Sequence, residues 1–157
     1  MHQFLTEQKL DYSIIVVEQI AGQTFNRGKL LNAGFIEAMN LYDWQCVLLT
    51  DVDLLPEDRR NLHVCPTQNP QHMSVAIDKF NYELFYDTLF GGSTFFTVNQ
   101  FLDVNGFSNR YWGWGGEDDD LYNRTIKAGY EVERYNATIA RYTMIIHDGS
   151  KSNAKNP

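Results

Sequence analysis

The most constraining feature of the chain is the order of its apolar runs over residues 12–50. Residues 12–18 form a short run rich in β-branched side chains, which is typical of a buried parallel strand. Apolar residues then recur at helical spacing from Leu30 to Met39, and residues 45–50 predict a second buried strand. The order strand, helix, strand predicts a right-handed parallel crossover and therefore an α/β fold.

The remaining apolar segments continue this pattern. We expect a third strand at 74–77, a short helix at 99–104, a longer helix over 117–128 that ends before Gly129, and a last strand at 138–146. The 157 residues, of which 43% are hydrophobic, suffice for one core. With no internal repeat or linker in view, the sequence predicts a single domain over residues 1–157.

Charge and hydropathy exclude two classes of partner. The formal net charge of −7 argues against a nucleic-acid surface, which needs a basic patch. No apolar run approaches the roughly 20 residues that span a bilayer, and the first residues lack the apolar centre of a signal peptide. Any membrane association is therefore expected to need an anchor outside this sequence.

Two carboxylates follow the second predicted strand directly. In open α/β sheets ligands bind at the carboxyl ends of strands, where Asp51 and Asp53 are placed. On an extended backbone their side chains would share one side while Val52 points away, so both could address a divalent ion and its anionic ligand. An acidic turn after a strand would give the same pattern. His147, after the last predicted strand, adds a nitrogen donor that favours manganese over magnesium.

Residues 112–120 combine two tryptophans, three glycines and four consecutive carboxylates. Tryptophan offers a flat face on which a sugar ring can stack, and glycines allow a mobile loop. Carboxylates can accept hydrogen bonds from sugar hydroxyls, and one of them can take a proton. An exposed turn before an acidic helix start would explain the charges but not the tryptophans. The block predicts a sugar site.

The only cysteines are Cys46 and Cys65, and no histidine stands at zinc-ligand spacing from them. They could form a disulfide or remain as two buried thiols. Two weak glycosylation patterns, at Asn123 and Asn136, lean towards an oxidising lumen, as a disulfide would. Because the cysteines flank residues 51–53, we predict a disulfide that braces this loop.

Several motifs together resemble the β-1,4-galactosyltransferase family, in order and spacing and over almost the whole chain. They are Phe-Asn-Arg-Gly-Lys-Leu-Leu-Asn from Phe25, Asp-Val-Asp-Leu-Leu-Pro from Asp51, Ala-Ile-Asp-Lys-Phe from Ala76, Phe-Gly-Gly from Phe90, Asn-Gly-Phe from Asn105, the block 112–120, and Met-Ile-Ile-His from Met144. The resemblance implies a GT-A fold with a mostly parallel central sheet flanked by helices. It also implies a Golgi enzyme that uses manganese and a UDP-sugar to extend terminal N-acetylglucosamine with inversion.

The resemblance assigns binding roles residue by residue. The implied Mn²⁺ ligands are Asp53, Met144 and His147. The implied donor site consists of Phe25, Arg27, Asp51, Val52, Lys79, Leu89, Gly91, Gly92, Trp114 and Glu117, with Arg27 and Lys79 facing the phosphates. The implied acceptor site consists of Phe80, Tyr86, Trp114, Gly115, Gly116, Asp118 and Asp119.

The four neighbouring acids are expected to divide the work, because successive side chains on a helix fan out by about 100°. We predict Asp118 as the general base that removes the proton from the acceptor O4, which gives inversion in one displacement. Glu117 would hold donor-sugar hydroxyls, Asp119 would bind the acceptor, and Asp120 would be structural. Trp114 would lie on a mobile glycine-rich loop that closes over the donor.

Leu89 bears on the donor sugar. Galactose-using members of the family carry tyrosine before Phe-Gly-Gly, whereas invertebrate members that use N-acetylgalactosamine carry an aliphatic residue. Leucine leaves room for the acetamido group, although it would also suit core packing. The resemblance therefore favours UDP-N-acetylgalactosamine, with UDP-galactose as the second donor.

The matched motifs leave two functions open. Family members have a further strand and a basic motif upstream and an acceptor segment downstream, so we expect the chain to be an incomplete catalytic domain. A metal-dependent glycosyltransferase explains why a base and a metal–diphosphate site occur together. A non-catalytic sugar-binding fragment of the same fold is the alternative.

Overall fold

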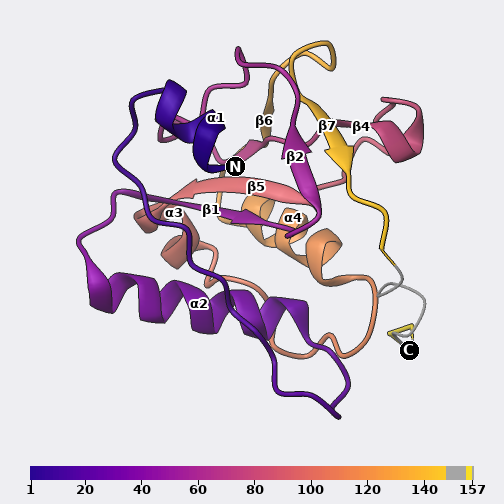
Figure 1. Cartoon of the computed structure of the whole chain (residues 1–157). Coiled ribbons are helices and arrows are strands. Elements are labelled where there is room, and N and C mark those ends of the chain that lie inside the picture. Colours follow the sequence, from indigo (N-terminus) through magenta and orange to yellow (C-terminus); the bar gives the residue numbers. More distant parts are fainter. Residues whose placement is uncertain (148–154, 157) are drawn as a thin grey trace.

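The computed structural model describes residues 1–147 and 155–156 (Figure 1). The helices are α1 (His2–Glu7), α2 (Arg27–Leu41), α3 (Val98–Asp103) and α4 (Glu117–Lys127), with a 3-10 turn η1 (Asp78–Phe80). The strands are β1 (Cys46–Thr50), β2 (Leu54–Pro56), β3 (Gln71–His72), β4 (Ala76–Ile77), β5 (Ser93–Thr97), β6 (Glu133–Arg134) and β7 (Arg141–Met144). The predicted helices are confirmed, whereas the predicted third and last strands are shorter than expected.

The strands form two sheets, in the orders β1-β5-β3-β6 and β2-β7-β4. Of the five strand pairings within the described residues, only β3–β6 and β4–β7 are parallel. The expectation of a mostly parallel sheet is therefore wrong for this part of the chain. The predicted strand–helix–strand crossover produces no parallel pair, because residues 12–18 form no strand and β1 pairs with the antiparallel β5.

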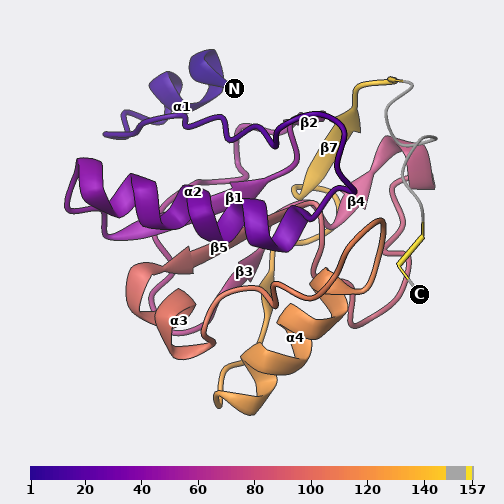
Figure 2. The same ribbon diagram turned by 90° about the horizontal axis from the view of Figure 1, so that it is seen from below.

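Two apolar clusters meet at β5, because successive side chains of a strand point to opposite faces. Phe96 belongs to the cluster formed with helices α2, α3 and α4, which include Phe35, Phe101 and Leu121. Phe95 belongs to the cluster formed with the second sheet. Figure 2 shows the three helices on one side of β1, β5 and β3. The molecule is thus layered as helices, first sheet and second sheet.

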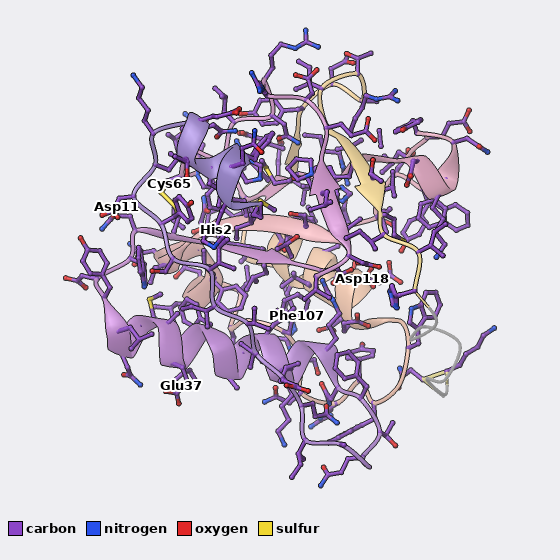
Figure 3. The ribbon with its side chains drawn as sticks, viewed as in Figure 1. His2, Asp11, Glu37, Cys65, Phe107 and Asp118 are labelled. Atoms are coloured by element: carbon purple, nitrogen blue, oxygen red, sulfur yellow. A yellow bond between two sulfur atoms is a disulfide. The ribbon has the colours of Figure 1, made fainter. Side chains whose placement is uncertain are left out.

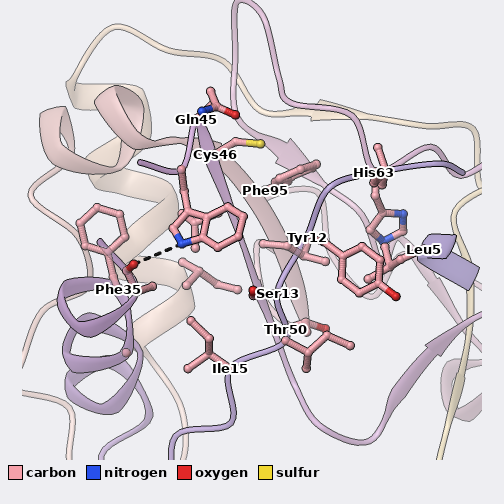
Figure 4. A pocket seen from close by; sticks show the side chains of 18 of the residues that line it. Leu5, Tyr12, Ser13, Ile15, Phe35, Gln45, Cys46, Thr50, His63 and Phe95 are labelled. Atoms are coloured by element: carbon pink, nitrogen blue, oxygen red, sulfur yellow. Dashed lines mark hydrogen bonds between the residues drawn. The ribbon is translucent and has the colours of Figure 1, made fainter. Parts of the chain in front are cut away.

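Residues 12–18, predicted to be a strand, form no strand. They run beside α2 and β1 (Figure 2) and share with both a cavity of about 300 Å³ (Figure 4). Val17 packs closely on α2, because a Cβ built at Gly34 would lie 2.5 Å from the Cγ2 atom of Val17. Val16 is 74% exposed. The β-branched run is therefore largely exposed, with only Tyr12 and Val17 partly buried, and it lacks the backbone partner that a strand needs.

The predicted disulfide between Cys46 and Cys65 is present, with the Cα atoms 5.6 Å apart. It ties β1 to the loop after β2, and Figure 3 shows Cys65 well away from Asp118. Among the helices of the described residues, none has the length and apolar character needed to cross a membrane.

Candidate active site

Arg27 joins three separate parts of the chain. Asn26 caps α2 by accepting from Lys29 N at 2.8 Å, which fixes the turn from which Arg27 projects. The Arg27 Nε donates to Asp51 Oδ1 at 2.7 Å, and Nη1 lies 3.7 Å from Glu117 Oε1. Nη2 donates to the Gly92 carbonyl at 3.4 Å. One guanidinium thus links the starts of α2 and α4 with the end of β1.

The guanidinium stays charged in this setting. Burial alone would lower the pKa of Arg27, but the carboxylates of Asp51 and Glu117 outweigh that effect and leave the pKa raised. The plane of Arg27 also lies over Phe107, with Cζ 5.6 Å from the ring centroid. Sequence reasoning placed Phe107 in a matched motif without assigning it a role.

Glu117 and Asp118 are carboxylates in a poorly solvated position. Burial raises the pKa of both groups, and the nearby Arg27 opposes the rise. Glu117 Oε2 is buried and has no hydrogen-bond partner within the described residues. An orphaned buried acceptor of this kind is suited to a ligand hydroxyl.

Asp118 lies against the backbone of Gly91. A Cβ at Gly91 would collide with Asp118 Oδ2, so only glycine permits this approach. The Gly91 carbonyl in turn lies 3.0 Å from His72 Nε2 and accepts from Ser74 Oγ at 3.3 Å. The position of the Asp118 carboxylate is therefore coupled to the loop that carries Leu89.

The other two acids have partners of their own. Tyr86 OH donates to Asp119 Oδ1 at 2.8 Å, and burial together with this carboxylate raises the pKa of Tyr86. Asp120 accepts from Arg124 Nε at 2.6 Å, one helical turn away. The four acids thus differ in their contacts, and Asp120 lies in a helix-stabilising pair.

Asp51 and Asp53 do not lie on an extended backbone, contrary to the sequence-based expectation. Residues 52 and 53 form a turn, in which Leu54 N donates to Asp51 O at 3.3 Å. The turn sends Asp51 to Arg27 and Asp53 to His147, and it leaves Val52 85% exposed. The two carboxylates therefore serve two adjoining groups, because turn geometry replaces the alternation of a strand.

Asp53 and His147 lie close together, with Oδ2 and Nε2 3.0 Å apart. The β2–β7 ladder causes this meeting, because it places Met144 opposite Leu54 and lets Ile145 N donate to Asp53 O at 2.8 Å. Over residues 1–147 and 155–156, no three residues drawn from His, Cys, Asp and Glu form a metal-holding group. Among these described residues, a third protein ligand beside Asp53 and His147 would be of another type, such as the Met144 thioether.

The glycine-rich loop before α4 exposes its two tryptophans, Trp112 and Trp114. Gly115 and Gly116 have φ of +102° and +92°, which side-chain-bearing residues rarely adopt. Trp114 is 63% exposed, and its carbonyl accepts from Asn156 N at 3.0 Å. Gly113 N donates to Phe25 O at 2.7 Å, which ties the loop to the segment before α2.

Lys79 and Phe80 lie apart from the Arg27 cluster, on η1 beside β7. The Lys79 ammonium is 5.8 Å from the centroid of the Phe80 ring. Phe80 contacts Phe85, which contacts Tyr86, with ring centroids 5.4 and 6.0 Å apart. An aromatic path thus leads from η1 to Asp119. The cavity beside residues 12–18 is lined by none of the implied site residues, so it is not part of this site.

Family models and known proteins match nearly the whole chain. The model for the N-terminal region of glycosyl transferase group 7 matches residues 1–66, and that for the N-terminal domain of galactosyltransferase matches residues 71–148. β-1,4-Galactosyltransferase 3 of Homo sapiens is 48% identical over all 157 residues, which are 40% of its length. β-1,4-Galactosyltransferase 1 of Mus musculus is 49% identical over the same residues, which are 39% of its length.

Solved structures give the class of the fold. The catalytic domain of Drosophila β1,4-galactosyltransferase 7, in complex with xylobiose, superposes with a TM-score of 0.81 at 32% identity. The match covers 99% of this chain and 65% of that one. A mutant of that enzyme in complex with manganese, UDP-Gal and xylobiose also gives 0.81, at 31% identity over 97% of this chain and 64% of that one.

The fold is therefore that of GT-A glycosyltransferase catalytic domains. More narrowly, the chain belongs to the β-1,4-galactosyltransferase family. It spans about 40% of the length of the relatives named above.

Proposed function

We propose that the chain carries the catalytic centre of a manganese-dependent, inverting β-1,4-glycosyltransferase of the Golgi. It would transfer N-acetylgalactosamine or galactose from a UDP-sugar to O4 of a terminal N-acetylglucosamine on a glycan. The observation that carries the proposal is the Asp118 carboxylate, which is poorly solvated, held against Gly91, and next to the Arg27–Asp51–Glu117 group.

Asp118 acts as the base in this proposal. Its raised pKa makes the carboxylate a better proton acceptor than an ordinary aspartate, while the positive charge of Arg27 favours the ionised form. Removal of the O4 proton lets the acceptor oxygen attack the anomeric carbon from the face opposite UDP. Glu117 accepts donor-sugar hydroxyls through its orphaned Oε2. Asp119 and Tyr86 orient the acceptor.

Asp53, His147 and Met144 would hold the manganese. Asp53 Oδ2 and His147 Nε2 are 3.0 Å apart, close enough for both to hold one divalent ion. When bound, the ion neutralises charge on the departing diphosphate. The Drosophila relative solved with manganese and UDP-Gal supports the choice of metal and donor class. Replacing Met144 with aspartate should shift the preference towards magnesium, which prefers oxygen ligands.

Leu89 favours N-acetylgalactosamine as the sugar transferred. Leu89 is half-buried and lies on the same loop as Gly91. Gly91 is the residue that Asp118 approaches closely. A leucine there leaves apolar space for an acetamido methyl group, whereas a tyrosine would fill it. Comparison of both UDP-sugars at equal concentration, in the parent chain and in Leu89→Tyr, tests this point. A parent chain that already prefers galactose would contradict it.

The decisive experiment is a transfer assay with Mn²⁺, a UDP-sugar and a β-linked N-acetylglucosamine acceptor. The chain should be assayed alone and extended by the flanking segments of the mouse relative. Transfer that depends on Mn²⁺ supports the proposal. Sugar binding without transfer in both forms would instead favour the alternative, a sugar-binding fragment of the same fold.

A further inference from the structure

The loop over residues 87–92 has no helix or strand of its own, yet it carries Leu89, Gly91 and Gly92. Backbone carbonyls in such a loop need partners if its position is to be defined. Here the partners come from two side chains that sequence reasoning did not single out, Arg134 and His72.

Arg134 holds two carbonyls of the loop. Its Nη2 donates to Asp87 O at 3.0 Å and to Leu89 O at 2.9 Å. Its Nε donates to His72 Nδ1 at 3.3 Å. The fork of a guanidinium supplies several donors in fixed directions, so a single side chain can restrain both backbone groups and the imidazole at once.

His72 extends the contact to Gly91. The side chain is fully buried. Burial, and to a smaller extent the positive charge of Arg134, lowers the pKa of His72 to about 3, so the ring is neutral. A guanidinium can only donate, so Nδ1 must accept and the proton of the neutral ring must sit on Nε2. Nε2 then donates to Gly91 O, 3.0 Å away.

The sheet register places these two residues together. β3 and β6 are a parallel pair in which His72 is the partner of Arg134. A slip of one residue in either strand would turn that strand's side chain to the other face and separate the pair. The loop is therefore held by a pair of side chains fixed by the β3–β6 ladder.

We propose that Arg134 and His72 are positioning residues that hold the loop 87–91 in place. Through this loop they position Leu89 in the donor-sugar site and the Gly91 backbone against which Asp118 lies. This inference rests on the proposed function for its consequence, because Leu89 and Asp118 matter as parts of a transferase. Its structural content, a loop held by one guanidinium and one Nε2-protonated imidazole, can be tested without turnover.

The kinetic test compares Arg134→Met and Arg134→Lys with the parent chain. Methionine keeps the length of the side chain but removes every donor, and the lysine ammonium cannot reproduce the guanidinium fork. We expect kcat/KM for the donor to fall by as much as ~10²-fold in Arg134→Met, with a smaller fall in Arg134→Lys. The ratio of the two donors should change, while UDP binding with Mn²⁺ stays at the parental level. Arg59→Met is the matched control, because Arg59 is exposed and pairs with Glu7.

Two measurements are independent of activity. Hydrogen exchange at residues 87–92 should quicken in Arg134→Met or, if that variant does not fold, in Arg134→Lys. Nitrogen NMR of the parent should show His72 neutral, with its proton on Nε2. Parental exchange rates and donor ratio in a folded variant, or an Nδ1–H tautomer, would overturn the proposal. A parent chain without transfer would count against the proposed function, and hydrogen exchange would still decide the role of the loop contacts.

Discussion

β1 is bordered by two regions that are held in different ways. Beside the strand, residues 12–18 line a cavity together with β1, and Val17 packs on α2. At its end, Asp51 is held by Arg27 at 2.7 Å and by backbone bonding to Gly92 O at 2.9 Å. Apolar contact has no preferred direction, whereas hydrogen bonds fix atoms to within a few tenths of an ångström. Chemistry that depends on atomic placement belongs at the end of the strand.

The contrast between these two regions predicts that the largest loss of transfer activity follows substitution of Asp118. Asp118→Asn keeps the shape of the side chain but cannot accept a proton, so transfer should fall by about 10²–10⁴-fold. UDP and Mn²⁺ binding should remain, because the change leaves Asp53 and His147 untouched. Initial rates and calorimetric titration with UDP measure the two effects.

Asp120→Asn is the matched control on the same helix. Asp120 pairs with Arg124, so its loss should cost only about 0.3–0.5 kcal/mol of stability and little activity. Comparable transfer by Asp118→Asn and the parent chain would assign the base to another residue.

The second prediction concerns the disulfide, whose two cysteines line the apolar cavity. Cys46 and Cys65 are 19 residues apart, and opening a loop of this length costs about 3 kcal/mol of stability in the loop-entropy model. We expect the Cys46→Ser, Cys65→Ser double variant to lose about this free energy of unfolding in urea titrations. If the double variant unfolds at the parental urea concentration, the disulfide does not stabilise the region around the apolar cavity.

The sequence predicted this molecule unevenly. Helical spacing and the polar start at Asn26 located α2, because both signals are local. The motif resemblance named Asp118 and Arg27, but it did not reveal that the two carboxylates after β1 separate in a turn. The run at 12–18 predicted a buried strand that does not form, since an apolar pattern does not show whether a backbone partner is present. Arg134 and His72 meet only through sheet register, across 62 residues of sequence, and no local pattern carries that information.

The third prediction uses pH to examine the charged end of β1. Transfer needs ionised Asp118, so activity is present above its pKa and is lost as the pH falls through it. Because that pKa is raised, the loss should begin at higher pH than for an ordinary aspartate. Arg27 lowers the pKa of Asp118, so Arg27→Met should move the acidic limb to still higher pH.

Rate profiles of the residual activity, with Mn²⁺ binding measured at each pH, separate this shift from a loss of bound metal. Arg59→Met, far from the acids in its pairing with Glu7, should keep the parental profile. An acidic limb that stays in place or moves to lower pH in Arg27→Met would show that Arg27 does not govern the base.

The smallest effect is expected beside β1, from two identical substitutions. Val16 is 74% exposed, so Val16→Thr should change the free energy of unfolding by no more than about 0.5 kcal/mol. Val47 lies in β1 and packs against the helix-side core, so Val47→Thr buries a hydroxyl and should cost about 1–3 kcal/mol. Urea titration of both variants gives the difference directly. Equal costs would mean that residues 12–18 are held as firmly as the strand they accompany, and the contrast between the two borders of β1 would then fail.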